Sequence, residues 1–154
     1  MTALLVYFFI ALVVSFLCSL LESVLLSVSH AHIAVLVKEG SKRGNLMFSL
    51  KENINRPLSA ILTINTIANT VGAAGVGAQT YSVFGSSWVA ISSIILTLSI
   101  LFFSEIIPKT LGANYTKSLV GFTAYMIRIL IFLVFPMVFI GEKISKILSR
   151  DSQD

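Results

Sequence analysis

The stretch LTLSILFFSEIIPKTLGANY, residues 96–115, decides how the rest of the chain is interpreted. An uncharged run that begins at Trp88 ends at Glu105, and Pro108 follows three residues later. A carboxylate at the end of an apolar helix is costly in lipid unless it has a partner, an ion or a water-filled cavity. Because Pro108 has no backbone N–H and clashes with the preceding turn, it frees carbonyl groups near Glu105. The pattern indicates either a cation site or a helix end where Glu105 pairs with Lys109 among lipid headgroups.

The composition places the chain among membrane proteins. Of 154 residues, 56% are hydrophobic and 12% are charged, whereas soluble domains carry about 25% charged residues. The formal net charge is +4. Because the basic residues lie beside apolar runs, anionic lipid headgroups are the expected partner. The sequence has no basic stripe with interleaved aromatic residues, which argues against nucleic acid binding.

The first expected transmembrane helix covers residues 3–28, enough to cross about 30 Å of hydrocarbon. Ser15, Ser19 and Ser23 recur at every fourth position, and Glu22 lies beside them. On a helix these residues share one face, which should point into protein rather than lipid. Back-bonding and small-residue packing explain the serines, but they do not explain Glu22.

Residues 29–56 form a polar, basic segment that is expected to fold as two short helices joined by a Gly40–Ser41 turn. Its five Lys and Arg residues favour the cytoplasmic side of the membrane. This assignment places the N-terminus outside the cell and Lys109 inside.

Two further transmembrane helices are expected over residues 57–80 and 87–108. Asn65 and Asn69 lie one turn apart in the first of them, and pairs of small residues follow at a spacing that lets another helix approach closely. Two interpretations stay open for the asparagines: hydrogen bonds between helices, or amide oxygens that act as ligands.

Residues 113–149 are apolar enough for a fourth span, but two observations argue against a crossing. Arg128 would lie at the bilayer centre, at a cost of at least roughly 2.5–3.5 kcal/mol. A crossing would also separate the lysines before this segment from the basic residues after it, against the positive-inside bias. We expect a helix along the cytoplasmic face, kinked near Pro136. Residues 151–154 are interpreted as a truncated linker.

Each expected span carries oxygen-bearing side chains at membrane depth, and no histidine lies there. Oxygen ligands suit Mg²⁺, Ca²⁺ or Na⁺ and argue against zinc or copper. Since the acids are few, a bound divalent ion can leave again, which suits transport better than storage. The oxygen-bearing residues are Ser19, Glu22, Ser23, Asn65, Asn69, Ser104 and Glu105.

These motifs resemble those of the CNNM/CorC transmembrane domain, and the resemblance covers essentially the full chain. Ser19-Leu-Leu-Glu22-Ser23 is similar to the family's Ser-x-x-Glu-(Thr/Ser) element, and residues 62–69 are similar to its Gly-Asn-x-x-x-Asn element. Residues 104–112, SEIIPKTLG, are similar to its Gly-Glu-Ile-x-Pro-Lys signature, the most specific of the three. Ile64 and Ser104 replace common glycines, a departure that affects local packing but keeps the oxygen ligands.

The resemblance implies an all-α integral membrane protein of the cell membrane with a cytoplasmic C-terminus. It implies a homodimer with three transmembrane helices per protomer, a cytoplasmic helical hairpin and a juxtamembrane belt helix. It also implies a following pair of CBS domains, outside this chain, which bind ATP and regulate transport.

The activity that the resemblance implies is Mg²⁺ efflux driven by Na⁺ entry, with the dehydrated cation bound through oxygen ligands from three helices. Carried over position by position, the expected cation ligands are Ser19, Asn65, Asn69 and Glu105, with Ser23 and a carbonyl near Gly112 as further candidates. A Na⁺ site or the cytoplasmic access path would involve Glu22 and Ser104.

Two other functions compete with transport. In a regulatory or scaffolding membrane module, the polar residues would only hold the helices and the dimer together. An intramembrane hydrolase is disfavoured because Ser19 and Ser23 have no histidine at their depth to act as a base. We therefore expect a protein that is not an enzyme.

Overall fold

The computed structural model describes residues 1–137 and 139–140, and the regular structure in these residues is entirely helical. The end of the expected juxtamembrane helix, from residue 141, and the expected linker 151–154 lie outside the described residues. In chain order the elements are α1 (Thr2–Ser27), α2 (His30–Lys38), α3 (Lys42–Glu52), α4 (Asn55–Phe84), η1 (Ser86–Trp88), α5 (Val89–Ser99), η2 (Ile100–Ile106), α6 (Ile107–Asn114) and α7 (Thr116–Leu133).

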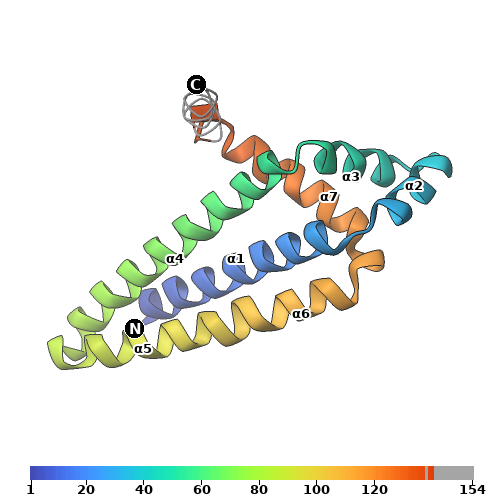
Figure 1. Ribbon diagram of the computed structural model, residues 1–154. Coiled ribbons are helices and arrows are strands. Elements are labelled where there is room, and N and C mark those ends of the chain that lie inside the picture. Colours follow the sequence, from blue (N-terminus) through green and yellow to red (C-terminus); the bar gives the residue numbers. More distant parts are fainter. Residues whose placement is uncertain (138, 141–154) are drawn as a thin grey trace, which may run out of the picture.

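α1 lies in the middle of the molecule, with α4 on one side and the continuous α5–η2–α6 rod on the other (Figure 1). α1 and the rod run in the same direction, and α4 runs in the opposite direction (Figure 1). Small residues let the helices approach, because Gly72 of α4 packs directly on Ala11 and Gly75 packs on the Tyr7 ring. The central position of α1 means that its polar face meets both neighbours.

Within the described residues, four stretches are long and apolar enough to cross a membrane by length and composition. Large apolar side chains also cover much of the outer surface, as on α5, where Ile94, Ile95 and Leu98 are exposed. An exterior of this kind suits lipid as the surrounding solvent. The chain is therefore a multi-pass membrane protein. The four stretches are Thr2–Ser27, Asn55–Phe84, Ser86–Asn114 and Thr116–Leu133.

Residues 29–56 contain α2 and α3, which pack against each other. Ser29 caps α2 by accepting a hydrogen bond from the backbone N–H of His32 at 3.3 Å. Gly40 takes the turn between the helices at φ +72°, a conformation that suits glycine. The hairpin therefore has local causes that are visible in the sequence.

α7 lies across the end of α1 that carries α2 and α3 (Figure 1). The main apolar core is at this end, where Leu21 and Leu25 of α1 meet Met47 of α3, Ile61 of α4 and Ile127 of α7. α7 ends at Leu133 and a turn at Val134 follows, two residues before Pro136. A proline cannot continue the backbone ladder of a helix, which accounts for a break at this point.

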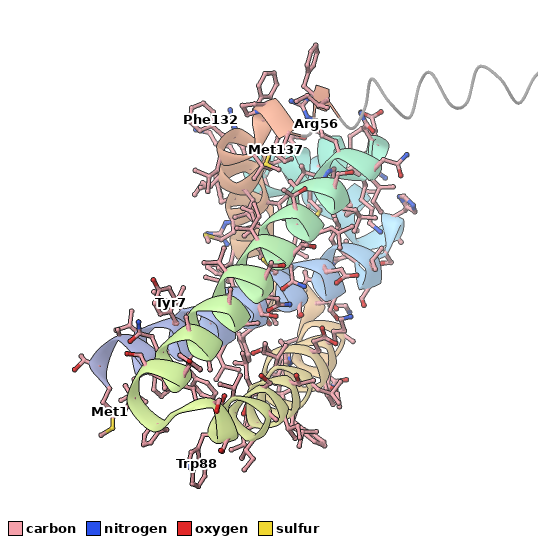
Figure 2. All side chains as sticks on the ribbon, turned by 90° about the vertical axis from the view of Figure 1, so that its left-hand side faces the viewer. Met1, Tyr7, Arg56, Trp88, Phe132 and Met137 are labelled. Carbon is pink, nitrogen blue, oxygen red and sulfur yellow. The ribbon has the colours of Figure 1, made fainter. Side chains whose placement is uncertain are left out.

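Aromatic side chains lie at both ends of the molecule. Met1, Tyr7 and Trp88 lie at one end, and Arg56, Phe132 and Met137 lie at the other (Figure 2). Aromatic rings such as Tyr7 and Trp88 are common where a membrane helix leaves the hydrocarbon.

Candidate functional site

The turn that contains Glu105 is a π-helix. η2 has wide turns, and the backbone N–H of Ile107 donates to the carbonyl of Phe102, five residues back. Pro108 lacks the N–H that the Ser104 carbonyl would accept in an α-helix, so a wider turn relieves the clash. The predicted loosening near Glu105 is therefore present, but the helix does not end there. It continues through α6 to Asn114 because the π-helix absorbs the effect of the proline.

η2 is attached to α1 through a side-chain hydrogen bond. Ser104 is 1% exposed, and its hydroxyl donates to the carbonyl of Leu12 at 2.8 Å. Glu105, the next residue, is half-buried and makes no ion pair or hydrogen bond with any residue that the structure describes. Lys109 pairs instead with Glu22 of α1, at 3.8 Å between Nζ and Oε2. The alternative with a Glu105–Lys109 pair is therefore not what the structure shows.

α6 touches α1 closely at Gly112. A Cβ atom added to Gly112 would lie 2.7 Å from Cβ of Ser23, closer than such atoms pack. The Ser23 hydroxyl donates to the carbonyl of Lys109 at 2.6 Å, and the Gly112 carbonyl accepts from the Thr116 hydroxyl at 2.7 Å. The structure brings the two candidate residues Ser23 and Gly112 into contact. The Ser23 hydroxyl and the Gly112 carbonyl, however, already have hydrogen-bonding partners in the protein.

The two asparagines of α4 carry oxygens without partners. Oδ1 of Asn65 and Oδ1 of Asn69 are buried, and neither accepts a hydrogen bond within the described residues. On an ideal helix Asn65 lies only about 20°, and Asn69 about 60°, around the axis from Gly72. Since Gly72 packs on α1, both amides lie on the side of α4 that faces α1. Such an oxygen costs about 1–3 kcal/mol unless an ion or a water satisfies it.

Ser19 lies between the two neighbouring helices of α1. Ala11, Ser15, Ser19 and Ser23 follow one another at every fourth position of α1, and we call them the serine row. Each of them points about 40° further around the helix axis than the one before it. The row starts at Ala11, which faces α4, and reaches Ser23, which faces α6. Ser19 is 2% exposed and therefore points between these contacts, toward the junction of the three helices.

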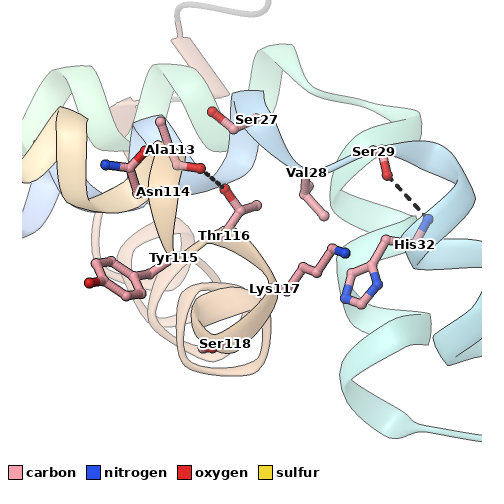
Figure 3. A pocket seen from close by; sticks show the side chains of 10 residues that line it. All are labelled: Ser27, Val28, Ser29, His32, Ala113, Asn114, Tyr115, Thr116, Lys117 and Ser118. Atoms are coloured by element: carbon pink, nitrogen blue, oxygen red, sulfur yellow. Dashed lines mark hydrogen bonds between the residues drawn. The ribbon is translucent and has the colours of Figure 1, made fainter.

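A cavity of about 510 Å³ opens where α1 and α6 end. Figure 3 shows its lining, with Ser29 bonded to the His32 backbone and Thr116 bonded to Ala113. Thr116 also bonds Gly112, so the cavity leads toward the α1–α6 contact. Lys117 is the lysine of this lining, which also contains His32 but no Asp or Glu. The cavity provides a polar approach from the α2 end.

Comparison with known domain families identifies the family of this chain. The cyclin M transmembrane N-terminal domain matches residues 6–153. The chain belongs to the cyclin M (CNNM) family. The predicted resemblance is therefore confirmed, and it covers nearly the whole chain.

Curated relatives of this cyclin M domain come from three bacteria. The UPF0053 protein sll1254 of Synechocystis is 34% identical over 137 residues, which cover 89% of this chain and 40% of that protein. A UPF0053 protein of Haemophilus influenzae is 29% identical over 97% of this chain and 36% of its own length. The UPF0053 inner membrane protein YfjD of Escherichia coli is 25% identical over 84% of this chain and 30% of its own length. The chain thus spans two fifths or less of these relatives.

The chemistry available in this cyclin M domain is that of neutral oxygens plus a few carboxylates. The described residues contain no group of three or more His, Cys, Asp or Glu side chains that could hold a metal ion. A site here would consist of hydroxyl and amide oxygens with Glu105. Hard cations accept such ligands, and soft metals prefer others.

Three buried hydroxyls of the domain were not among the expected site residues. Oγ of Ser15, Oγ1 of Thr80 and Oγ1 of Thr123 are buried without a partner in the described residues. Ser15 belongs to the predicted serine row, so the sequence carried a signal for it. Thr123 lies in α7, within an apolar segment that gave no such signal.

Proposed function

We propose that this chain is the membrane domain of a Mg²⁺ exporter, with efflux coupled to Na⁺ entry. The observation that carries the proposal is the pair of buried, unpartnered amide oxygens of Asn65 and Asn69 on the side of α4 that faces α1. Hydrogen bonding within the described protein leaves these acceptors open, and a cation is a partner that supplies what they lack.

The charge around the junction suits an ion that has to leave again. Glu22 is paired with Lys109, so Glu105 is the carboxylate that remains unpaired among the described candidates. One carboxylate and several neutral oxygens attract Mg²⁺ without fully neutralising it. Because Mg²⁺ gives up its water reluctantly, oxygen ligands from three helices have to replace that water when the ion binds.

The proposed topology has three crossings, with α7 as a belt on the cytoplasmic side. Both ends of α7 support it, because Thr116 lines the cavity where α1 ends, and Phe135, just beyond α7, stacks under Arg56 at the start of α4. A helix whose two ends lie at the same end of a bundle does not traverse it. The basic residues of the α2–α3 hairpin support a cytoplasmic position for this end and an outside position for the N-terminus.

The partners of the domain are also proposals. We propose that two copies form a homodimer in the cell membrane. In the full-length protein, ATP-binding CBS domains would follow and regulate transport. The relatives are more than twice as long as the matched region, which leaves room for such domains.

The experiment that tests the function measures the melting temperature of purified protein against MgCl₂ concentration, with NaCl at equal ionic strength as reference. A ligand that binds only the folded state raises the melting temperature as its concentration rises. Wild type should show this rise, and Glu105→Gln and Asn69→Ala should lose most of it. Ser93→Ala is the matched control, because Ser93 is exposed and bonds only its own helix at the Val89 carbonyl.

Transport itself is tested with the full-length protein in liposomes loaded with Mg²⁺. Efflux should require a Na⁺ gradient and should fall to the protein-free rate in Glu105→Gln. Equal efflux from Glu105→Gln and wild type would reject the site.

The competing scaffold function has support of its own. The hydrogen bonds of Ser104 to Leu12 and of Ser23 to Lys109 join separate helices, as the scaffold interpretation expects for all polar residues. That function predicts that Asn69→Ala changes the melting temperature equally with and without Mg²⁺. The melting series therefore separates the two functions.

A further inference from the structure

We infer that the hydroxyl of Ser15 is a further oxygen ligand of the transported cation, which would then bind one turn closer to the N-terminal end of α1 than the Ser19–Ser23 motif indicates. The inference rests on the proposed function and identifies where along the junction the ion lies. Its evidence comes from the hydrogen bonding, direction and depth of Ser15.

Ser15 is one of three buried hydroxyls in the described residues that have no hydrogen-bonding partner, with Thr80 and Thr123, and it is the one of the three that lies in α1. Serine and threonine in a helix commonly donate to the carbonyl four residues back. Thr63, Thr97 and Ser99 do this here, at 2.7–2.8 Å. Ser15 is 0% exposed, and its hydroxyl has no partner in the described residues. A buried hydroxyl that leaves its own backbone carbonyl unused is available to a ligand.

The direction of Ser15 follows from contacts on both sides of it in the row. Ala11 meets Gly72 of α4, and Ser23 meets Gly112 of α6. With about 40° between residues spaced by four, Ser15 lies between these two directions, as Ser19 does. Ser15 therefore points into the junction, on the side nearer α4 and its asparagines.

The depth of Ser15 relative to the rod follows from two contacts between parallel helices. Ser104 reaches the Leu12 carbonyl, and Gly112 meets Ser23. When positions along the two helices are matched by these contacts, Ser15 lies level with residues 104–107. The carboxylate of Glu105 therefore starts from the same depth as the Ser15 hydroxyl.

The depth relative to α4 follows from the antiparallel pair. Gly72 meets Ala11 and Gly75 meets Tyr7, so positions on α4 fall as positions on α1 rise. Continued by one turn, this register puts Ser15 between Asn65 and Asn69. Oxygens from α1, α4 and η2 thus share one level, and that level contains Ser15.

The Ser23 end of the serine row has fewer free oxygen atoms for a cation. The Ser23 hydroxyl and the Gly112 carbonyl are both used in hydrogen bonds between protein groups. The helices also touch there without space for a Cβ atom on Gly112. The cation therefore binds at the level of Ser15 and Ser19, and the Ser23–Gly112 contact holds α6 against α1.

The test compares Ser15→Ala, Ser15→Thr and the control Ser93→Ala in purified protein, with Mg²⁺ affinity measured by calorimetry. Ser15→Ala should weaken Mg²⁺ binding by about tenfold, which corresponds to one lost ligand contact of ordinary strength. Ser15→Thr keeps the hydroxyl and should restore most of the affinity. The melting temperature of Ser15→Ala without Mg²⁺ should not fall, since the change removes an unsatisfied polar group. A serine that serves only helix packing would give the reverse pattern.

A second variant reports on ligation directly. In a Cys18→Ala background, Ser15→Cys should lose Mg²⁺ affinity and gain affinity for Cd²⁺, because a thiolate is a soft ligand. Cd²⁺ binding equal to that of the Cys18→Ala parent would overturn the inference, even if Ser15→Ala fails to fold.

The outcomes distinguish this inference from the proposed function. Wild-type Mg²⁺ affinity in Ser15→Ala, together with weakened affinity in Glu105→Gln, would reject Ser15 and leave the exporter standing. Wild-type affinity in Glu105→Gln and Asn69→Ala would reject both.

Discussion

Glycine residues show how individual contacts set the distances between these helices. At Gly112 an added Cβ would press against Ser23 and the Leu20 carbonyl, both held in α1. At Gly121 the nearest atoms belong to the flexible Arg43 side chain of α3, which can move aside. At Gly77 nothing in the described residues lies within 4 Å. The three sites therefore differ in what a methyl group would cost.

We predict that Gly112→Ala lowers the stability of the protein by about 1–3 kcal/mol, the usual cost of forcing volume into a packed contact. Gly121→Ala should change it little. Gly77→Ala should be neutral or stabilising by up to about 1 kcal/mol, because alanine favours the helix. Melting temperatures in one detergent, without Mg²⁺, provide the comparison. Equal values for Gly112→Ala and Gly77→Ala would mean that α1 and α6 do not touch as described.

Individual residues also show where sequence-based prediction reached its limit. The serine row on α1 was visible as a repeat of four, and so was its preference for protein over lipid. The sequence did not distinguish Ser23, which bonds Lys109, from Ser15, which bonds nothing described. That difference depends on which helix lies opposite each residue, and a repeat within one helix carries no information about its neighbours.

At the scale of elements, the π-helix explains how one proline shapes the site. In η2 the side chains of Ser104 and Glu105 sit on a wider turn than an α-helix provides. Ser104 holds that turn against α1 through Leu12. The direction of Glu105 is thus set by Pro108, which lies in the following turn.

We predict that Pro108→Ala lets η2 return to regular α-helical turns and rotates Glu105 relative to Ser104. Mg²⁺ affinity should fall by about tenfold or more, while the melting temperature without Mg²⁺ stays the same or rises, since a helix gains a hydrogen bond. Pro57→Ala is a suitable control, because Pro57 lies in the first turn of α4, where a missing N–H costs little. Unchanged Mg²⁺ affinity in Pro108→Ala would show that the wide turn does not position the carboxylate.

The boundaries of elements were predictable only where a strong breaker marks them. The sequence placed the end of the second span at residue 80, but α4 continues to Phe84 and stops at Gly85, which has φ +88°. It placed the end of the third span at Pro108, but the rod continues to Asn114. α4 continues because no residue before Gly85 forces it to stop, and the rod continues because the π-helix absorbs the effect of Pro108.

At the scale of the whole molecule, hydropathy identified a membrane protein but did not distinguish apolar helices that cross the membrane from apolar helices that do not. α7 is apolar enough to span, yet its first turn and the residues after it lie at the same end of the bundle. Arg128 on its exposed side favours a position near the membrane surface. The central place of α1 was not predictable either, because it depends on glycines of α4 meeting Ala11 and Tyr7.

The number of crossings can be tested with single cysteines in a Cys18→Ala background and a thiol reagent that does not cross membranes. With three crossings and α7 as a belt, Ser86→Cys reacts in intact cells, while Ser41→Cys and Ser152→Cys react only after the cells are opened. If α7 crossed the bilayer, Ser152→Cys would react in intact cells as Ser86→Cys does. The Ser41→Cys variant tests the orientation, since the basic residues of the α2–α3 hairpin predict a cytoplasmic position for it. If Ser41→Cys reacted in intact cells, the proposed topology would be inverted. The proposed direction of Mg²⁺ movement would then be wrong as well.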